Sequence, residues 1–311
     1  MDRVSRSFIA VCAVVSLLVA GAGASPAPAK NVNGCVIKVK TDCKNANLLR
    51  AKLPIFEIEA NPNSEVPGMR FFSKYVEVFG LGIYAESGLT DSQVLHAAAI
   101  LAELLDNNEN GVVDDKALLA KLKRSKAIVP MFNSDRSKAS KDFRRRNRTF
   151  ASSAVLFAGE VDPKKPGYWG SDASVEEIMH IINQIGHRIV YPKAFGMQPN
   201  SSLLSDSMDV ARGGKFRSTP RRYPKDAWYH YDDKTCEYAC MATEYLYWAQ
   251  VSNMGILNDK ATCDGIANEW EPCSKQLLKR MDPLMYALIT NPRYKLPQNA
   301  PDGKYGPYFK E

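Results

Sequence analysis

Apolar residues recur along this chain at two spacings, one typical of strands and one typical of helices. Segment 75–85 (YVEVFGLGIYA) alternates β-forming residues with a period close to two, which predicts one strand with a bulge at its glycines. In segment 94–105 apolar residues instead repeat every three or four positions, and Thr90 and Gln93 form a capping box before it. We therefore expect a strand followed by a long, strongly apolar helix.

Segment 174–186 predicts a helix whose apolar and polar positions fall on separate faces. At about 100° per residue, six polar side chains occupy an arc of roughly 120°. They are Glu176, Glu177, His180, Asn183, Gln184 and His187. This polar seam lacks Lys and Arg, although 24% of the residues in the chain are charged. Because a solvated helix face usually carries Lys or Arg, we expect the seam to face a cleft or a cation; the alternative is a seam that is solvated or hydrogen-bonded within the core.

Both ends of this helix carry sequence signals. Ser174 and Glu177 match an S-x-x-E capping box, and Asp172 just upstream is an alternative cap. Gly186 followed by Pro192 predicts where the helix ends.

Within the polar seam, residues 176–180 read Glu-Glu-Ile-Met-His. This segment resembles the H-E-x-x-H motif of the zincin metallopeptidases, with Glu in place of the first His. In that motif two ligands one helical turn apart hold Zn²⁺, and the Glu between them activates a metal-bound water. The resemblance implies that Glu176 stands at the first ligand position, Glu177 at the general base and His180 at the second ligand. The departure at Glu176 leaves room for another divalent metal or for a pseudoenzyme.

A second predicted helix, residues 236–253 with Gly255 as its stop, places one carboxylate among apolar residues. The neighbours of Glu244 one turn away are Cys240, Met241, Tyr247 and Trp248. Since a buried, unpaired carboxylate is costly, Glu244 should be protonated, paired with an Arg or Lys, or bound to a metal. The resemblance to gluzincin-type zincins implies the metal, because their third ligand is a Glu on a downstream helix. Arg212 and the arginines after it are the alternative partners.

Three further histidines are candidates of different kinds. His187 is an alternative to Glu176 as a metal ligand. His230 lies in the segment WYHYDD, where it could bind metal, donate a hydrogen bond to an oxyanion or line a polar loop. His96 lies within the apolar helix, a position more typical of a packed or surface histidine than of a ligand.

Segment 106–114 (DNNENGVVD) joins the apolar helix to a further helical pattern, giving a helix–loop–helix over 91–123. It resembles the calcium loop of an EF-hand, in which oxygen ligands surround a turn Gly. Carried over to this chain, the ligands are Asp106, Asn108, Asn110, the carbonyl of Val112, and Asp114. Ala117 replaces the bidentate Glu of position twelve, so the resemblance implies weaker calcium binding. A plain helix-connecting turn is the alternative.

Residues 1–24 match a secretory signal peptide, with basic residues before a short apolar run and small residues after it. Without them, six of the seven cysteines remain, and an even number in a secreted chain favours disulfides. They are Cys35, Cys43, Cys236, Cys240, Cys263 and Cys273. Short spacings suggest that Cys35 pairs with Cys43 and Cys263 with Cys273, which leaves Cys236 with Cys240. The sequence does not select one pairing, and Cys236 with Cys240 could instead be half of a metal site. No later run is apolar over the roughly 18 residues that a membrane span needs.

Segment 136–148 is strongly basic and is expected to form a loop. Three interpretations compete: a solvated loop, an Arg-x-x-Arg processing site ending at Arg148, and a binding patch for acidic extracellular polymers. Nucleic acid is not expected, because no matching binding module accompanies the basic residues. Sequons at Asn147 and Asn200 are candidate glycosylation sites.

Short runs of β-forming residues at 127–132 and 154–157 add two strands. Strand, long helix, strands and then a helix with the degenerate motif is the order in which a zincin catalytic domain is built. The resemblance therefore implies a zincin-like α+β fold, and we expect residues 25–311 to form one secreted domain with disulfide-stapled termini. The segment 227–248 (AWYHYDDKTCEYACMATEYLYW) also resembles a group of secreted proteins, which implies no particular activity.

Together these features predict a secreted divalent-metal protein. Zinc or another transition metal would be held by His180 and Glu244 with Glu176 or His187, and Glu177 would activate a water to hydrolyse a peptide or similar bond. The alternatives are a non-enzymatic extracellular calcium-binding protein, matrix- or mineral-associated, and a zincin pseudoenzyme. A separation above about 8 Å between the Glu244 carboxylate and the His180 ring would exclude a shared metal, because ligands lie within roughly 2–2.6 Å of their ion.

Overall fold

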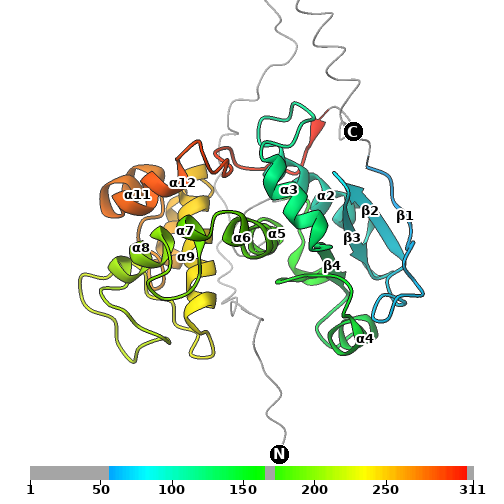
Figure 1. Ribbon diagram of the computed structural model, residues 1–311, viewed down its shortest axis with the longest axis horizontal. Coiled ribbons are helices and arrows are strands. Elements are labelled where there is room, and N and C mark those ends of the chain that lie inside the picture. The colour runs from blue at the N-terminus through cyan, green and yellow to red at the C-terminus, as the bar shows by residue number, and fades with distance from the viewer. Residues whose placement is uncertain (1–55, 165–171, 307–311) are drawn as a thin grey trace, which may run out of the picture.

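A small sheet and two groups of helices make up the part of the chain that the computed structural model describes, residues 56–164 and 172–306. The strands are β1 (Glu59–Ala60), β2 (Lys74–Val78), β3 (Leu81–Ala85), β4 (Ile128–Phe132) and β5 (Leu156–Phe157). The helical segments up to the polar seam are α2 (Asp91–Leu105), α3 (Lys116–Arg124), α4 (Lys138–Arg146), η1 (Ala158–Glu160), α5 (Ser174–Ile181) and η2 (Ile182–His187). Those after it are α6 (Arg188–Val190), α7 (Pro192–Phe195), α8 (Leu203–Ala211), α9 (Tyr238–Met254), α10 (Lys260–Ile266), α11 (Lys275–Met281) and α12 (Pro283–Ile289). The predicted α+β class is confirmed, and α5 and α6 lie between the sheet and the later helices (Figure 1).

The strands pair in chain order, β1-β2-β3-β4-β5. The first three are antiparallel, whereas β3, β4 and β5 run parallel. The crossover from β3 to β4 carries α2 and α3, and α2 packs against β2, β3 and α5. This crossover places α2 between the sheet and the polar-seam helix. The expected signal peptide and the pair Cys35 and Cys43 lie outside the described residues.

The single strand expected over 75–85 is instead a hairpin. Val78 pairs with Leu81, and Phe79 and Gly80 form the two-residue turn with φ of 51° and 80°. Two-residue hairpin turns favour positive φ because this geometry matches the right-handed twist of the strands. A turn this short leaves the alternation of apolar residues almost unbroken, and Phe is an unusual residue at positive φ. The sequence pattern therefore hid the turn.

The start of α2 was predicted correctly and is tied to the start of α5. The Thr90 hydroxyl accepts a hydrogen bond from the Gln93 amide at 3.2 Å, and the Gln93 side chain accepts one from the Thr90 amide at 3.0 Å. On the same helix, His96 is buried, and its Nε2 lies 2.7 Å from the Asp172 carboxylate. His96 is thus a packed histidine that links two helices.

The predicted capping box at Ser174 is wrong. Ser174 is the first residue within α5, the cap position belongs to Ala173, and the Asp172 carboxylate accepts a hydrogen bond from the Ser174 amide at 3.1 Å. Asp172, the alternative cap, therefore satisfies one of the free amides at the helix start.

Gly186 does not end the polar-seam helix. It lies in the π-helical segment η2, and the chain continues directly into α6. A Cβ at this position would lie 2.3 Å from Leu118 Cδ1, on α3. Gly186 thus allows α3 to approach the helix closely, and Pro192 instead opens α7.

Replacing Gly186 with alanine should destabilise the protein by about 1–2 kcal/mol, because overpacking against the buried Leu118 outweighs the gain in helix propensity. Urea unfolding would measure this change. Gly159→Ala is the matched control, since a Cβ there meets nothing within 4 Å, and it should stay within about 0.5 kcal/mol of the parent. Equal stability of the two variants would contradict the tight contact.

Helix α9 ends as predicted and carries one of two described disulfides. Gly255 terminates it in the left-handed conformation with φ of 80°. Cys236 bonds to Cys240 at the start of the helix, and Cys263 bonds to Cys273. These two predicted pairings are confirmed, so Cys236 and Cys240 are not half of a metal site. None of the described helices is long and apolar enough to cross a membrane.

The basic segment 136–148, expected as a loop, contains helix α4. The Ser137 hydroxyl caps it by accepting a hydrogen bond from the Ser140 amide at 3.1 Å. On its inner side, Phe143 packs against Phe72 and Phe132 in a small aromatic core. The helix buries only a few side chains, so the many charges concealed its apolar pattern.

Candidate metal centre

The polar seam of α5 and η2 faces helix α9. Asn183 donates a hydrogen bond to the Gln250 side chain at 2.8 Å, and Gln184 donates one to the Thr243 hydroxyl at 3.0 Å. The C-terminal part of the seam, at Asn183 and Gln184, is therefore hydrogen-bonded within the core. The N-terminal part, at Glu176 and His180, differs because carboxylates lie next to an imidazole there.

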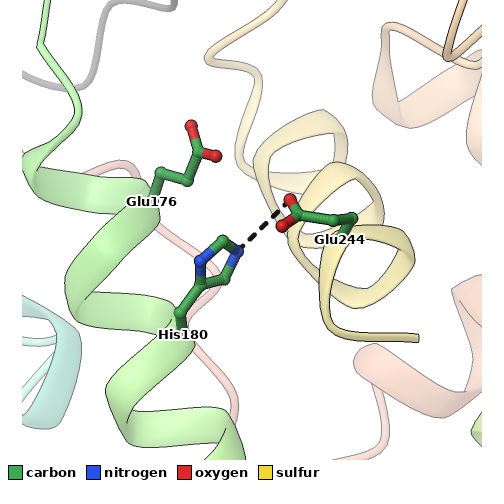
Figure 2. A group of neighbouring side chains, drawn as sticks. All are labelled: Glu176, His180 and Glu244. Atoms are coloured by element: carbon green, nitrogen blue, oxygen red, sulfur yellow. Dashed lines mark ion pairs between the residues drawn. The ribbon is translucent and has the colours of Figure 1, made fainter. Parts of the chain in front are cut away.

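Glu176, His180 and Glu244 come together at the upper end of this contact. Each offers one ligand atom, and these atoms all lie within 4.8 Å of one another. Glu176 and His180 project from successive turns of α5, and Glu244 reaches toward them from α9 (Figure 2). His180 Nε2 lies 3.4 Å from the Glu244 carboxylate, far inside the limit for sharing one ion.

A second carboxylate, that of Glu177, lies near the other ring nitrogen of His180. Glu177 Oε2 lies 3.7 Å from Nδ1, whereas Glu244 faces Nε2. Histidines that bind metals through one nitrogen commonly have the other nitrogen oriented by a carboxylate. The structure thus places Glu177 at ion-pair distance from Nδ1, on the ring edge opposite Glu244.

Nε2 of His180 has no hydrogen bond among the described residues. It is buried and faces Glu244 at ion-pair distance, but without hydrogen-bond geometry. Buried polar atoms in proteins are usually hydrogen-bonded, so an unsatisfied nitrogen in this position fits a metal ligand.

The group is acidic and has no Lys or Arg partner among the described residues. Arg212, the alternative partner considered for Glu244, instead binds Asp209 at 2.7 Å. Two more carboxyl groups add negative charge nearby: Glu269 interacts electrostatically with Glu244, and Glu160 with Glu177, which lies beside His180. A partly buried cluster of carboxylates with one imidazole favours uptake of protons or of a cation.

The pKa values follow from this concentration of negative charge. Burial, together with the charge of Glu244, raises the pKa of Glu176 well above its usual range. Burial by itself would lower the pKa of His180, but the carboxylates of Glu244 and Glu177 raise it well above 6.5. Burial also raises the pKa values of Glu160 and Glu269 to about 7.

His187, the alternative ligand, is not part of this group. Its Nδ1 lies 3.0 Å from the Asn183 side-chain oxygen, and its ring packs against Tyr191 and Phe195. Burial lowers its pKa to about 4. A π-helical turn contains more residues than an α-helical turn, so η2 rotates His187 away from the direction of His180.

His230 also lies apart from the group. Its Nε2 is 4.0 Å from Glu271, and its ring packs against Tyr223. Its backbone amide donates a hydrogen bond to the Glu269 carbonyl at 2.7 Å, which is a main-chain link between the two regions. The structure brings no metal-ligand group to His230 among the described residues.

The EF-hand-like loop is closed by its own hydrogen bonds. The buried Asp106 carboxylate accepts from the Asn110 amide at 3.2 Å and from the Gly111 amide at 2.7 Å. It also accepts a short hydrogen bond from the Tyr305 hydroxyl. Calcium binding at this loop stays a prediction.

The other residues predicted to bind calcium also form hydrogen bonds within the loop. Asn108 donates to Asp114 at 3.2 Å, and Asp114 also accepts from the Asn107 amide at 2.8 Å. The Asn110 side chain accepts from the Val112 amide at 2.8 Å, and Val112 is exposed.

The two sequons differ in their surroundings. The Asn147 side-chain amide donates a hydrogen bond to the Phe150 carbonyl at 2.8 Å. Asn200 is exposed, and its side-chain oxygen accepts from Lys215 at 2.8 Å. Glycosylation stays a prediction at both, and the amide nitrogen of Asn200 is the less engaged of the two.

Glu160 and Glu269 were missed at the level of sequence. Neither belongs to a motif, and both reach the site from segments whose placement depends on the fold. The one local signal is the Asn-Glu-Trp-Glu segment around Glu269, whose side chain accepts a hydrogen bond from Trp248 at 2.8 Å.

Comparison of the chain with protein-family models, with curated proteins and with solved structures found no significant match.

Proposed function

We propose that this protein binds one divalent transition metal through Glu176, His180 and Glu244, and uses it for hydrolysis. The observation that carries the proposal is the convergence of three ligand atoms within 4.8 Å from two helices. One imidazole with two carboxylates suits zinc and related metals, whereas calcium prefers oxygen ligands alone. Three protein ligands are also the number typical of catalytic zinc sites, which keep a position for water.

The chemistry supplied by such an ion, when bound, is a water of lowered pKa and a polarised substrate oxygen. The protein residues have separate tasks in this proposal. Glu177 holds the His180 ring through Nδ1 and keeps Nε2 directed toward Glu244. Glu177 is therefore a positioning residue here, and not the base that the zincin resemblance implies.

Glu160 and Glu269 both have pKa values of about 7, and we assign Glu269 as the general base because it interacts with both carboxylate ligands. Burial raises its pKa to about 7, and it interacts with the carboxylates of Glu176 and Glu244. The hydrogen bond from Trp248, one turn after Glu244 on α9, fixes one of its oxygens. A general base is most effective when its pKa lies near the working pH.

A hydrolysis screen on the metal-loaded protein tests this proposal. The metal-loaded protein should cleave one or more peptide, ester or amide substrates. This activity should be lost when a chelator removes the metal and should return when the metal is added back. Glu269→Gln should lower kcat by about 10²–10⁴-fold, the range for loss of a general base, with metal content unchanged. Metal binding without hydrolysis of any of these substrates would support a metal-binding protein that is not a hydrolase.

A further inference from the structure

The positive charge of this chain is concentrated in one short segment. Residues 135–148 contain seven Lys and Arg and two Asp, a net charge of +5 against +7 for the whole chain. Helix α4 forms most of this segment and lies below β4 in Figure 1, well apart from α9. It is thus separate from the candidate metal centre.

The packing of α4 directs these charges to solvent. Ala139 and Ser140 are fully buried, and Phe143 packs against Phe72 and Phe132 at ring separations of 5.9 Å and 5.7 Å. All seven basic side chains of the segment are exposed. Because the inner side of the helix is packed against the protein, the charges lie on its outer side.

Three of these cations form a stripe without ion pairs among the described residues. Lys138, Lys141 and Arg145 fall within an arc of roughly 60° over about 10 Å of helix. Arg144 and Arg146 flank the stripe, but they form ion pairs with Asp135 and Asp142. These ion pairs use the carboxylates of Asp135 and Asp142, so no nearby negative charge on a described residue neutralises the three cations of the stripe.

We propose that α4 binds an acidic polysaccharide through Lys138, Lys141 and Arg145. A linear chain carrying sulfate or carboxylate groups can follow a stripe of cations spaced along a helix, and binding gains from several weak contacts at once. Arg145 adds a planar guanidinium that pairs with two anionic oxygens.

Other polyanionic partners fit this surface less well. A membrane-binding helix presents apolar residues beside its cations, whereas the apolar residues of α4, Ala139 and Phe143, are buried. The two disulfides indicate an oxidising compartment, where polysaccharides are a more common polyanion than nucleic acids.

Heparin oligosaccharides are a direct probe of this surface. The variant Lys138→Gln/Lys141→Gln/Arg145→Gln should weaken heparin binding at least about tenfold at low ionic strength, as measured by titration calorimetry. Its control is Lys193→Gln/Lys275→Gln/Arg280→Gln, which removes two exposed lysines and one exposed arginine elsewhere. The control should bind like the parent protein, and circular dichroism would verify that both variants fold.

Each outcome decides the proposal. A tenfold or larger loss confined to the α4 variant supports it. No binding by the parent, an unchanged α4 variant, or equal losses in both variants would overturn it, because binding would then be absent or would follow net charge alone. Equal or tighter binding to a DNA duplex of similar length would assign the surface to nucleic acid instead.

Discussion

Replacing His180 with alanine is expected to abolish stoichiometric binding of zinc or another transition metal. The variant removes the only imidazole in the group and leaves carboxylates alone, which suit magnesium, calcium or manganese better than zinc. Loss of a group that merely orients a ligand costs about 10–100-fold in metal affinity, so loss of the ligand itself should cost more. Metal analysis of the protein purified without chelator, followed by equilibrium dialysis, measures the effect.

Two further variants separate loss of a ligand from loss of the fold. His230→Ala removes a histidine outside the group and should keep the full metal content. Glu244→Gln keeps the shape of the side chain but removes its negative charge, so it should also bind metal poorly while remaining folded. Full metal content in both His180→Ala and Glu244→Gln, with native circular dichroism, would rule out this centre.

The sequence placed the principal site residues for a physical reason. Because an α-helix has 3.6 residues per turn, Glu176 and His180 are expected on one helix face. Because burying an unpaired carboxylate is costly, Glu244 is expected to have a partner. The structure supplies that partner, since His180 is 3.4 Å away. Burial and charge account for the proximity of the two side chains, whereas a metal bound between them stays a prediction.

Other features of the site could not be read from periodicity. The π-helical segment changes the rotation between His180 and His187, and no residue in it signals that change. Which ring nitrogen faces Glu177 depends on a side-chain rotamer. Glu269 reaches the site because α9 and the later segment pack together, and this contact is set by tertiary structure alone.

The fold was predictable in the same uneven way. The capping box of α2 and the glycine stop of α9 are local signals that tertiary contacts did not override. The turn at Phe79 and Gly80 and the helix at 138–146 were hidden, the first by an uninterrupted apolar pattern and the second by charge. Local signals succeeded where one residue type determines the geometry, and failed where long-range packing does.

Metal binding is expected to tighten as pH rises through the neutral range, with release of protons. Without metal, protons bound to His180 and Glu176 offset the negative charge of the site, because the pKa values of these two groups lie well above their ordinary 6.5 and 4.5. Each must lose its proton before it binds a metal, so affinity should rise up to about tenfold per pH unit for each proton displaced.

The stability of the protein should show the same linkage. The raised pKa of His180 contributes stability that is complete below pH 6.5 and is lost as pH rises through its folded value. The raised pKa of Glu176 has the same direction, because the folded state then binds more protons than the unfolded state above pH 4.5. Above about pH 6.5, where the opposite contribution of His187 is already complete, the metal-free protein should therefore lose stability with rising pH, while the stabilisation gained on adding metal increases.

Thermal unfolding between about pH 5 and 8, with and without zinc, measures this difference. At a free metal concentration of about 100 times Kd, the expected stabilisation is about 2.7 kcal/mol, and it should shrink toward acid pH as Kd rises. Glu244→Gln should flatten the pH dependence, since it removes a charge that raises both pKa values. A zinc-induced shift that grows toward acid pH would contradict protonation of the ligands, because metal and protons would not then compete for the same atoms.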